Sequence, residues 1–208
     1  ILSHLPFPPI ETAPSLFKEQ LSNWGSAYLK PRFGGLGRGV SKVEPGDPLP
    51  AWGKGTIRGG SEPTFLQQAV SPPSNLGSLC VRWLTQREES GQWKLLPPVA
   101  RVSKHSVANV HQGAEALPAE DVLSANALKQ GKALVLDCAN ALQDQIQGVA
   151  VELGVDLLFD RQEKAWVLEV NSRPSGRLSA LTARDAKRYG PIAHEAVLRP
   201  LRTLASLR

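Results

Sequence analysis

Two largely apolar segments, residues 149–160 and 161–171, meet at a short polar turn and constrain the fold more than any other stretch. Runs of this length, rich in Val, Leu and Trp, are typical of the two strands of a β-hairpin. If Phe159 pairs with Trp166, the remaining residues follow in antiparallel register. The opposing pairs expected on that basis are Leu158 with Val167, Leu157 with Leu168, and Asp156 with Glu169.

Acidic side chains on a hairpin of this kind are costly unless something neutralises them. Directly opposed residues share a face of a sheet, so Asp156 and Glu169 would face each other about 5 Å apart. Asn171 follows on the same face, because side chains alternate along a strand. Three oxygen donors without sulfur or imidazole suit a hard ion such as Mg²⁺. The sequence therefore predicts a metal site formed by Asp156, Glu169 and Asn171.

A simpler interpretation stays open, in which these residues lie on an exposed strand face and are merely solvated. The register is also an assumption, and a slip of one residue would move Asp156 to the opposite face. Under either alternative the three oxygen groups would not converge on a metal.

The chain has 208 residues, enough for one sizeable core or for two small lobes. No apolar run reaches the roughly 20 residues of a membrane span, and no signal peptide opens the sequence. Cys80 and Cys138 are far apart, which argues against a disulfide framework or a zinc site and indicates the cytoplasm. The sequence contains no Met, so we expect a fragment or a processed chain with something missing before Ile1.

The net charge of +5 favours polyanionic partners such as ATP, nucleic acid or acidic peptides. Charge alone does not choose among them. No known nucleic-acid-binding module is recognisable, which argues against nucleic acid. The oligomeric state is left open by the sequence.

Strands and helices are mixed without regular βαβ alternation, which predicts the α+β class. Residues 15–25 have apolar side chains at helical spacing and end at a glycine, a typical helix C-cap. Residues 118–147 are helical in pattern, and Gly131 is expected to divide them into two helices. Residues 178–208 are again helical, with an interruption expected at Gly190–Pro191. Strands are expected in residues 26–33 and 64–70, with two or three antiparallel strands in 78–104.

A glycine-rich loop follows the strand that carries Lys30. Its glycines are Gly34, Gly35, Gly37 and Gly39. Glycines let backbone N–H groups approach phosphate oxygens, and Lys30 would add a positive charge. The spacing fits neither the P-loop nor the dinucleotide-binding fingerprint, so on its own the loop favours the interpretation of a plain flexible turn.

Together these features resemble the ATP-grasp superfamily of ATP-dependent carboxylate–amine ligases. The shared pattern is a Lys-Pro before a glycine loop, followed far downstream by D-x-x-x-D and W-x-L-E-x-N. Residues 83–114, with R…G-x-W…A-R-V…N-x-H-x-G, are similar to the YheC/YheD branch, known as endospore coat-associated proteins. The stretches "PIETAP" and "VELGVDLLFD…WVLEVNSRPSG" fit the same branch, and the likeness runs from about Pro9 to about Leu204.

The resemblance implies an ATP-grasp fold in which two α+β lobes, residues 1–70 and 71–208, clamp a nucleotide between them. It implies ATP and one or two Mg²⁺ ions as cofactors, with Mn²⁺ as an alternative ion. The implied reaction joins an unknown carboxylate to an unknown amine through an acyl phosphate, with ADP and phosphate as by-products.

The resemblance also assigns roles to individual residues. Triphosphate contacts are implied for Lys30, Gly34, Gly35, Gly37 and Gly39, and the adenine hinge matches Gln67, Gln68, Ala69 and Val70. Arginines that face phosphate or acyl-phosphate oxygens match Arg82 and Arg101, and a polar position near the γ-phosphate and the acceptor matches Asn109. The metal ligands match Asp156, Glu169 and Asn171.

Three departures from the family pattern favour an alternative function. The acidic residue usual two positions before the first arginine is Cys80 here, and the second glycine after N-x-H-x is Ala114. The N-terminal lobe that precedes the ATP-grasp domain in typical members is also absent from the sequence. The alternative is a non-catalytic ATP-binding module with a role in assembly, for example in a spore coat. Without the family pattern, Arg82 and Arg101 would be interpreted as surface arginines.

Overall fold

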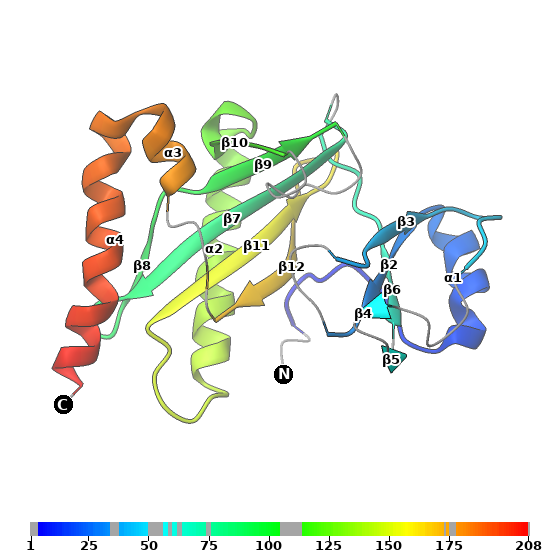
Figure 1. The fold of residues 1–208 in the computed structure, drawn as a ribbon, viewed down its shortest axis with the longest axis horizontal. Coiled ribbons are helices and arrows are strands. Elements are labelled where there is room, and N and C mark those ends of the chain that lie inside the picture. Colours follow the sequence, from blue (N-terminus) through cyan, green and yellow to red (C-terminus); the bar gives the residue numbers. More distant parts are fainter. Residues whose placement is uncertain are drawn as a thin grey trace. The chain divides into compact units, whose positions relative to one another are not determined.

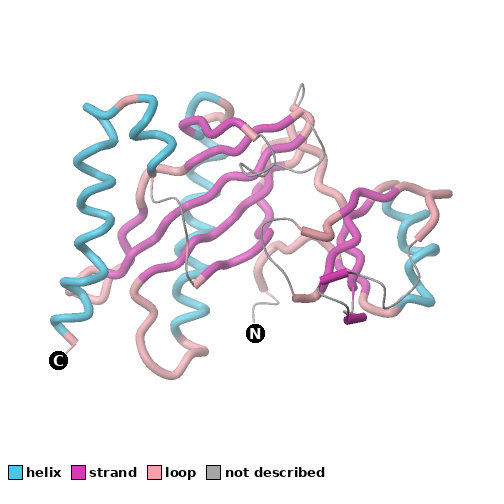
Figure 2. The backbone as a smooth tube through the Cα atoms, viewed as in Figure 1, coloured by secondary structure: helices cyan, strands magenta, loops and turns pink. Residues whose placement is uncertain are grey.

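The computed structural model describes residues 4–33, 38–49, 56–57, 60–61, 64–73, 76–104, 114–172, 174 and 178–207. Helices and antiparallel sheets are mixed along the chain (Figure 1, Figure 2), which confirms the predicted α+β class. The chain forms two compact units. The smaller is Pro8–Ser71, and the larger joins Ile1–Phe7 to Pro72–Arg208.

The smaller unit contains a four-stranded antiparallel sheet in the order β1-β6-β2-β3. Its strands are β1 (Ile10–Glu11), β2 (Ala27–Pro31), β3 (Ser41–Val43) and β6 (Thr64–Gln68). A helical turn, η1 (Pro14–Leu16), leads into α1 (Phe17–Trp24), whose Phe17 and Leu21 pack on the sheet. The helix ends at Gly25 with φ of 72°, as predicted. The short strands β4 (Thr56–Ile57) and β5 (Gly60–Ser61) pair with each other.

The larger unit contains a six-stranded antiparallel sheet in the order β10-β9-β7-β11-β12, with β8 paired to the end of β7. Its strands are β7 (Ser78–Arg87), β8 (Trp93–Leu95), β9 (Val99–Ser103), β10 (Glu115–Pro118), β11 (Glu152–Phe159) and β12 (Ala165–Asn171). Its helices are α2 (Ala125–Gln143), α3 (Ser179–Arg184) and α4 (Ala186–Ser206), with a helical turn η3 (Ala119–Asp121).

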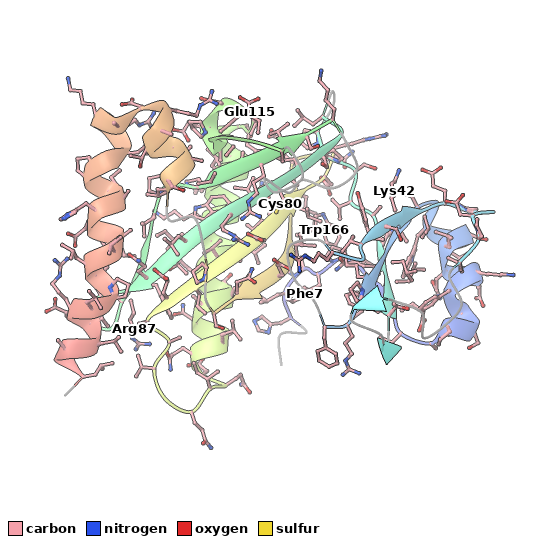
Figure 3. The ribbon with its side chains drawn as sticks, viewed as in Figure 1. Phe7, Lys42, Cys80, Arg87, Glu115 and Trp166 are labelled. Carbon is pink, nitrogen blue, oxygen red and sulfur yellow. The ribbon has the colours of Figure 1, made fainter. Side chains whose placement is uncertain are left out.

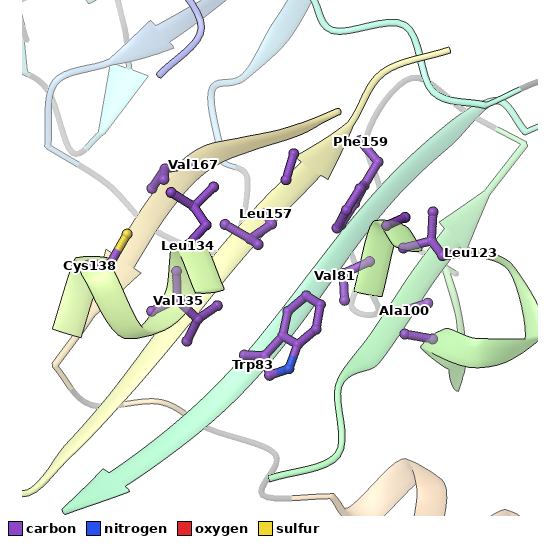
Figure 4. Close-up of a cluster of buried hydrophobic side chains, with 14 of the residues drawn as sticks. Val81, Trp83, Ala100, Leu123, Leu134, Val135, Cys138, Leu157, Phe159 and Val167 are labelled. Carbon is purple, nitrogen blue, oxygen red and sulfur yellow. The ribbon is translucent and has the colours of Figure 1, made fainter. Parts of the chain in front are cut away.

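The two faces of this sheet carry different structures, because alternate residues of a strand point to opposite sides. On β7, Val81 and Trp83 enter the core between the sheet and α2 (Figure 4). Leu84 points the other way and packs with Tyr189 and Ala196 of α4. Cys80 and Arg82 share the face of Leu84, so their side chains are also turned away from the α2 core.

Helix α2 is a single helix, so the prediction that Gly131 divides it was wrong. Gly131 instead marks a close approach between the helix and the sheet. A Cβ on this residue would lie 2.7 Å from Trp83 Cη2 and 3.1 Å from Phe159 Cζ. The glycine therefore lets two large aromatic side chains fill the core beneath the helix, at a cost of about 1 kcal/mol in helix propensity.

The hairpin of β11 and β12 forms as predicted, but with a different register over half its length. Asp156 does lie opposite Glu169, whereas Leu157 pairs with Val167 and Leu158 with Trp166. The register shifts between Asp156 and Leu157, which leaves Leu168 as the extra residue of a β-bulge.

The bulge has a clear physical reason. In a regular strand Val167 and Glu169 would point to the same face. With the bulge, Val167 joins Leu157 in the buried core, and Glu169 points to the opposite face with Asp156. The predicted pairing of Leu157 with Leu168 would have turned Val167 out of the core, so it was wrong.

The C-terminal helices are interrupted at Asp185 and not at Gly190–Pro191 as predicted. Asp185 has an extended backbone, and its side chain accepts a hydrogen bond from the Arg188 N–H (2.9 Å), which caps α4. Pro191 lies inside α4, where burial of Tyr189 and Ala196 against the sheet holds the helix together. Among the described residues no helix is both long and apolar enough to cross a membrane.

Residues 4–7 belong with the larger unit. Leu5 lies in its core, and the Val167 N–H donates a hydrogen bond to the Pro6 carbonyl oxygen (2.8 Å). The lobe boundary expected between residues 70 and 71 stays a prediction. The compact units differ from it chiefly in placing residues 1–7 with residues 72–208.

Candidate functional site

A cluster of charged side chains lies on the face of the larger sheet opposite α2. It is built from four neighbouring strands, β9, β7, β11 and β12. Arg82 of β7 lies opposite Asp156 of β11, and Asp156 lies opposite Glu169 of β12. On the other side of β7, Cys80 lies opposite Arg101 of β9. These residues share one face, and Cys80 lies near the middle of the sheet (Figure 3).

Arg82 and Asp156 form the tightest contact of the cluster. Arg82 donates from Nε to Asp156 Oδ1 (2.7 Å) and from Nη2 to Asp156 Oδ2 (2.6 Å). This two-pronged geometry gives the strongest kind of arginine–carboxylate pair. Asp156 is only 1% exposed, so these contacts replace the hydrogen bonds to water that it loses on burial. Burial disfavours the charged form of Arg82, but its hydrogen bonds to Asp156 and the negative charges of Asp156 and Glu169 together outweigh this and raise the pKa of Arg82 above its ordinary value.

Weaker contacts complete the cluster. Arg101 Nη2 lies 3.6 Å from Asp156 Oδ1, and Arg82 Nη2 lies 3.8 Å from Glu169 Oε1. Asn171 Nδ2 donates a hydrogen bond to Glu169 Oε1 (3.0 Å). Two guanidinium groups thus face two carboxylates. The arginine side chains are each only 17% exposed, so the interpretation of Arg82 and Arg101 as plain surface arginines was wrong.

Cys80 sits inside this cluster as a buried thiol. Burial raises the pKa of Cys80 far above its ordinary value, and the negative charge of Asp156 raises it further. The thiol therefore stays protonated at neutral pH, and Cys80 adds no negative charge where the family pattern has an acidic residue.

The donor set of Asp156, Glu169 and Asn171 fits a hard cation only in part. Both oxygens of Asp156 are already bonded to Arg82, so its repulsion with Glu169 is relieved by arginine and needs no metal for that purpose. The Glu169 side chain is 56% exposed, and its oxygens and that of the Asn171 amide suit Mg²⁺. Mg²⁺ commonly takes one or two protein oxygens and completes its shell with water and phosphate. Among the described residues, no group of three or more His, Cys, Asp and Glu could hold a metal by itself.

In the smaller unit, Lys30 of β2 and Gln67 of β6 form a pair on one face of the sheet. Lys30 Nζ donates to Gln67 Oε1 (2.5 Å) and lies 5.8 Å from the centre of the Tyr28 ring. Gln67 is 5% exposed. Its side chain therefore positions Lys30, a role that the hinge assignment did not include.

Two other hinge candidates, Gln68 and Ala69, are hydrogen-bonded within the smaller unit. The Gln68 N–H donates to the Pro9 carbonyl oxygen (2.8 Å), and the Ala69 N–H donates to that of Ser26 (3.1 Å). Adenine could reach these two N–H groups only if those hydrogen bonds broke. The hinge role of Gln68, Ala69 and Val70 stays a prediction.

Several of the other predicted site residues lie outside the described part of the chain. These are Gly34, Gly35 and Gly37 of the glycine loop, and Asn109. Gly39, the last glycine of the loop, is described and has φ of 71°, a conformation that favours glycine. Its role, like that of the other three glycines and Asn109, stays a prediction.

The structure adds Gly154 to the site, which the motif analysis missed. Gly154 lies opposite Asn171 in the hairpin, and a Cβ on it would lie 2.7 Å from Pro174 Cβ. Pro174 therefore lies in close contact with β11. The sequence contained a feature that could have placed Gly154 in the site. Apolar residues alternate there with Glu152, Gly154 and Asp156, so these three residues share one face of the strand.

A polar network, also missed, ties the same face of β7 and β11 to α4. The buried Gln86 side chain donates to Glu152 Oε2 and to the Ala196 carbonyl oxygen, both at 2.5 Å. Arg199 of α4 donates to Gln86 Oε1 (2.8 Å). The sequence carried no signal for this network, because its members come from three separate segments.

Comparison with known proteins shows a family match over most of the larger unit. Residues 52–194 match the model of the family described as YheC/D-like ATP-grasp. The endospore coat-associated protein YheC of Bacillus subtilis (strain 168) is 30% identical over 109 residues, which cover 49% of this chain and 30% of that protein.

Solved structures show the same fold at low sequence identity. Biotin carboxylase from Campylobacter jejuni is 14% identical with a TM-score of 0.65, over 95% of this chain and 43% of that one. D-alanyl-alanine synthetase A from Vibrio cholerae is 15% identical with a TM-score of 0.59, over 97% of this chain and 61% of that one. The chain thus spans less than two thirds of the length of each of these proteins.

Proposed function

The chain belongs to the YheC/D-like ATP-grasp family. We propose that it binds ATP with a divalent cation and acts as an ATP-dependent carboxylate–amine ligase. The product is an amide, in which the carboxyl carbon of one substrate is bonded to the amine nitrogen of the other. ADP and phosphate leave as by-products.

The observation that carries this proposal is the convergence of Arg82, Arg101, Asp156, Glu169 and Asn171 on one face of the larger sheet. Two permanently charged, forked cations beside accessible oxygen donors suit a polyphosphate and its metal ion. A structural surface would not need two half-buried arginines and a fully buried carboxylate in contact.

Each group has a role in the proposed reaction. Glu169 and Asn171 would hold Mg²⁺ or Mn²⁺, with Asp156 beside them, and the metal would neutralise charge on the phosphate oxygens.

Lys30 and the glycine loop would bind the triphosphate, and Asn109 would lie near the acceptor. Arg82 and Arg101 would face oxygens of the transferred phosphoryl group and of the acyl phosphate formed when the substrate carboxylate attacks it. The protein positions the reactants and balances charge, and supplies no nucleophile of its own.

Thermal unfolding with ATP and Mg²⁺ tests the proposal. The wild-type chain should gain stability with both ligands present, since a ligand that binds only the folded state stabilises it. Glu169→Ala should lose most of that gain. Glu115→Ala is the matched control, because Glu115 is a similarly exposed carboxylate (63%) on the edge strand β10 (Figure 3). Equal gains in wild type and Glu169→Ala would contradict the metal assignment.

A second candidate is an ATP-binding module without turnover, with a role in assembly. The name of the YheC relative, an endospore coat-associated protein, favours it. Phosphate release measured with a panel of carboxylates and amines separates the two candidates. Tight nucleotide binding without turnover on any pair would support the module, and release that depends on both acceptors would support the ligase. Location in the cytoplasm or in a spore coat stays a prediction.

A further inference from the structure

The acidic pair of the cluster is neutralised within the protein itself. Arg82 and Arg101 carry two positive charges, and Asp156 and Glu169 carry two negative charges. Arg82 contacts both carboxylates, with its guanidinium fork on Asp156 and Nη2 3.8 Å from Glu169 Oε1. It therefore lies where a cation shared by the two acidic groups would be expected.

We propose that Arg82 is a built-in substitute for the divalent cation, holding Asp156 until the metal arrives and then exchanging Asp156 for a phosphate oxygen. This inference rests on the proposed metal binding. The partner of Arg82 then depends on the ligand state of the site.

Electrostatics makes the two partners of Asp156 compete. A guanidinium group and a divalent cation repel each other, so they compete for the same carboxylate oxygens. Asp156 is 1% exposed and cannot stay unpaired, because an isolated buried carboxylate is very costly. The metal can therefore gain Asp156 only as Arg82 releases it.

Arg101 is not the arginine that exchanges Asp156 for phosphate. It makes a single contact with Asp156 Oδ1 at 3.6 Å, beyond hydrogen-bond length, whereas Arg82 makes two short hydrogen bonds. Arg101 can stay in place when Arg82 moves. Arg82 is the arginine whose release would change the number of free oxygens on Asp156.

The exchange couples metal binding to phosphate binding. A released Arg82 brings an unpaired positive charge to the face that carries the metal donors, which favours a phosphate oxygen there. By thermodynamic linkage, phosphate on Arg82 must in turn favour metal on Asp156. The protein without nucleotide should therefore bind the metal weakly, and the nucleotide should strengthen that binding.

The test is calorimetric titration of the full chain with Mn²⁺ in the absence of nucleotide. Arg82→Gln removes the competing cation, so it should bind Mn²⁺ about tenfold more tightly than wild type, within the usual range of such couplings. Arg184→Gln is the control, because Arg184 pairs with Glu115 at an exposed site outside the cluster. It should match wild type.

Two results would overturn the exchange in distinguishable ways. If wild type binds Mn²⁺ and Arg82→Gln binds it equally or more weakly, Arg82 does not compete, and the proposed function survives. If neither protein binds Mn²⁺ with or without ATP, the metal assignment itself fails and the exchange fails with it.

A measurement on wild type covers the case in which Arg82→Gln folds poorly. The Arg82 Nε–H, bonded to Asp156, should give a shifted, slowly exchanging signal in ¹⁵N-resolved NMR, assigned by its loss in Arg82→Lys. Saturating Mg²⁺ and ADP should move that signal and speed its exchange with solvent. An unchanged signal at saturation would overturn the proposal.

Discussion

Asp156 is held by Arg82 through two hydrogen bonds of 2.7 and 2.6 Å across the β7–β11 pair, in a site where the carboxylate is 1% exposed. The pair joins residues 74 positions apart in the sequence. It therefore links two central strands of the sheet as well as two members of the candidate site.

Asp156→Asn should destabilise the protein even without ligands. The amide cannot balance Arg82 and Arg101, which would then face each other with little solvent. Removing one partner of a buried pair costs about 3–5 kcal/mol, and we expect the lower end because Arg82 retains some exposure. Urea unfolding measures the loss. Glu115→Gln, in an exposed pair, should change stability by less than about 1 kcal/mol, and an equally small effect of Asp156→Asn would contradict the structural role of the pair.

Gly154→Ala should cost much more stability than Gly190→Ala. At Gly154 the new methyl would lie 2.7 Å from Pro174 Cβ, and neither group is flexible, so overpacking should cost about 1–3 kcal/mol. At Gly190, inside α4, nothing lies within 4 Å of the new methyl apart from the adjoining residues and the backbone of the helix itself. The gain in helix propensity from alanine there is offset by its clash with the ring of Pro191, which follows it, so the net change should be less than about 1 kcal/mol. Thermal or urea unfolding of both variants measures the two changes, and an equally large loss at both positions would contradict this difference.

The hairpin was predictable from sequence because its two strands are close in the chain. The opposition of Asp156 and Glu169 was predicted from an assumed pairing of Phe159 with Trp166, which was wrong, since Phe159 pairs with Ala165. The bulge at Leu168, which the sequence did not predict, shifts the register by one residue and so brings Asp156 opposite Glu169. It exists because Val167 must enter the core beneath α2 while Glu169 faces the other way, a demand set by tertiary packing and not by the hairpin itself.

The partner of Asp156 could not be predicted for a related reason. Arg82 lies opposite Asp156 only because β7 is placed between β9 and β11, and sequence order does not determine that arrangement. The role of Gly131 was missed for the same cause, since it depends on Trp83 and Phe159 from two other strands. Patterns along the chain thus predicted that Asp156 lies opposite Glu169, but not that Arg82 holds Asp156.

Gln67→Met should weaken nucleotide binding, because it removes the side chain that holds Lys30 in place. The substitution removes a hydrogen bond to a charged group, worth about 1.5–3 kcal/mol, that fixes the Lys30 ammonium. If Lys30 contacts phosphate as proposed, ADP affinity should fall about tenfold or more. Calorimetric titration with ADP and Mg²⁺ measures it, with Lys18→Met on the exposed side of α1 as the control. Unchanged affinity in Gln67→Met would mean that Lys30 binds the nucleotide without help from Gln67, or not at all.

Stability should fall at alkaline pH, with Cys138 of α2 as one cause. Burial, and then the charge of Asp137, raise the pKa of Cys138 from 9.0 to about 12. Burial likewise raises the pKa values of Cys80 and Tyr28. Between the unfolded and folded pKa values, the unfolded thiol has lost its proton and the folded thiol has kept it. The stabilisation is therefore complete below about pH 9 and is lost as pH rises toward 12.

The contribution of Cys138 is separable by substitution. Each such group should lower the free energy of unfolding by about 1.4 kcal/mol per pH unit within its window. Cys138→Ala should cost about 1 kcal/mol of stability at neutral pH through the small cavity it leaves. At alkaline pH, the free energy of unfolding of this variant should fall less steeply than that of wild type, because one ionising thiol has been removed. Urea unfolding between about pH 8 and pH 10.5 gives both slopes. Equal slopes in wild type and Cys138→Ala would show that the thiol ionises as readily in the folded protein as in the unfolded chain.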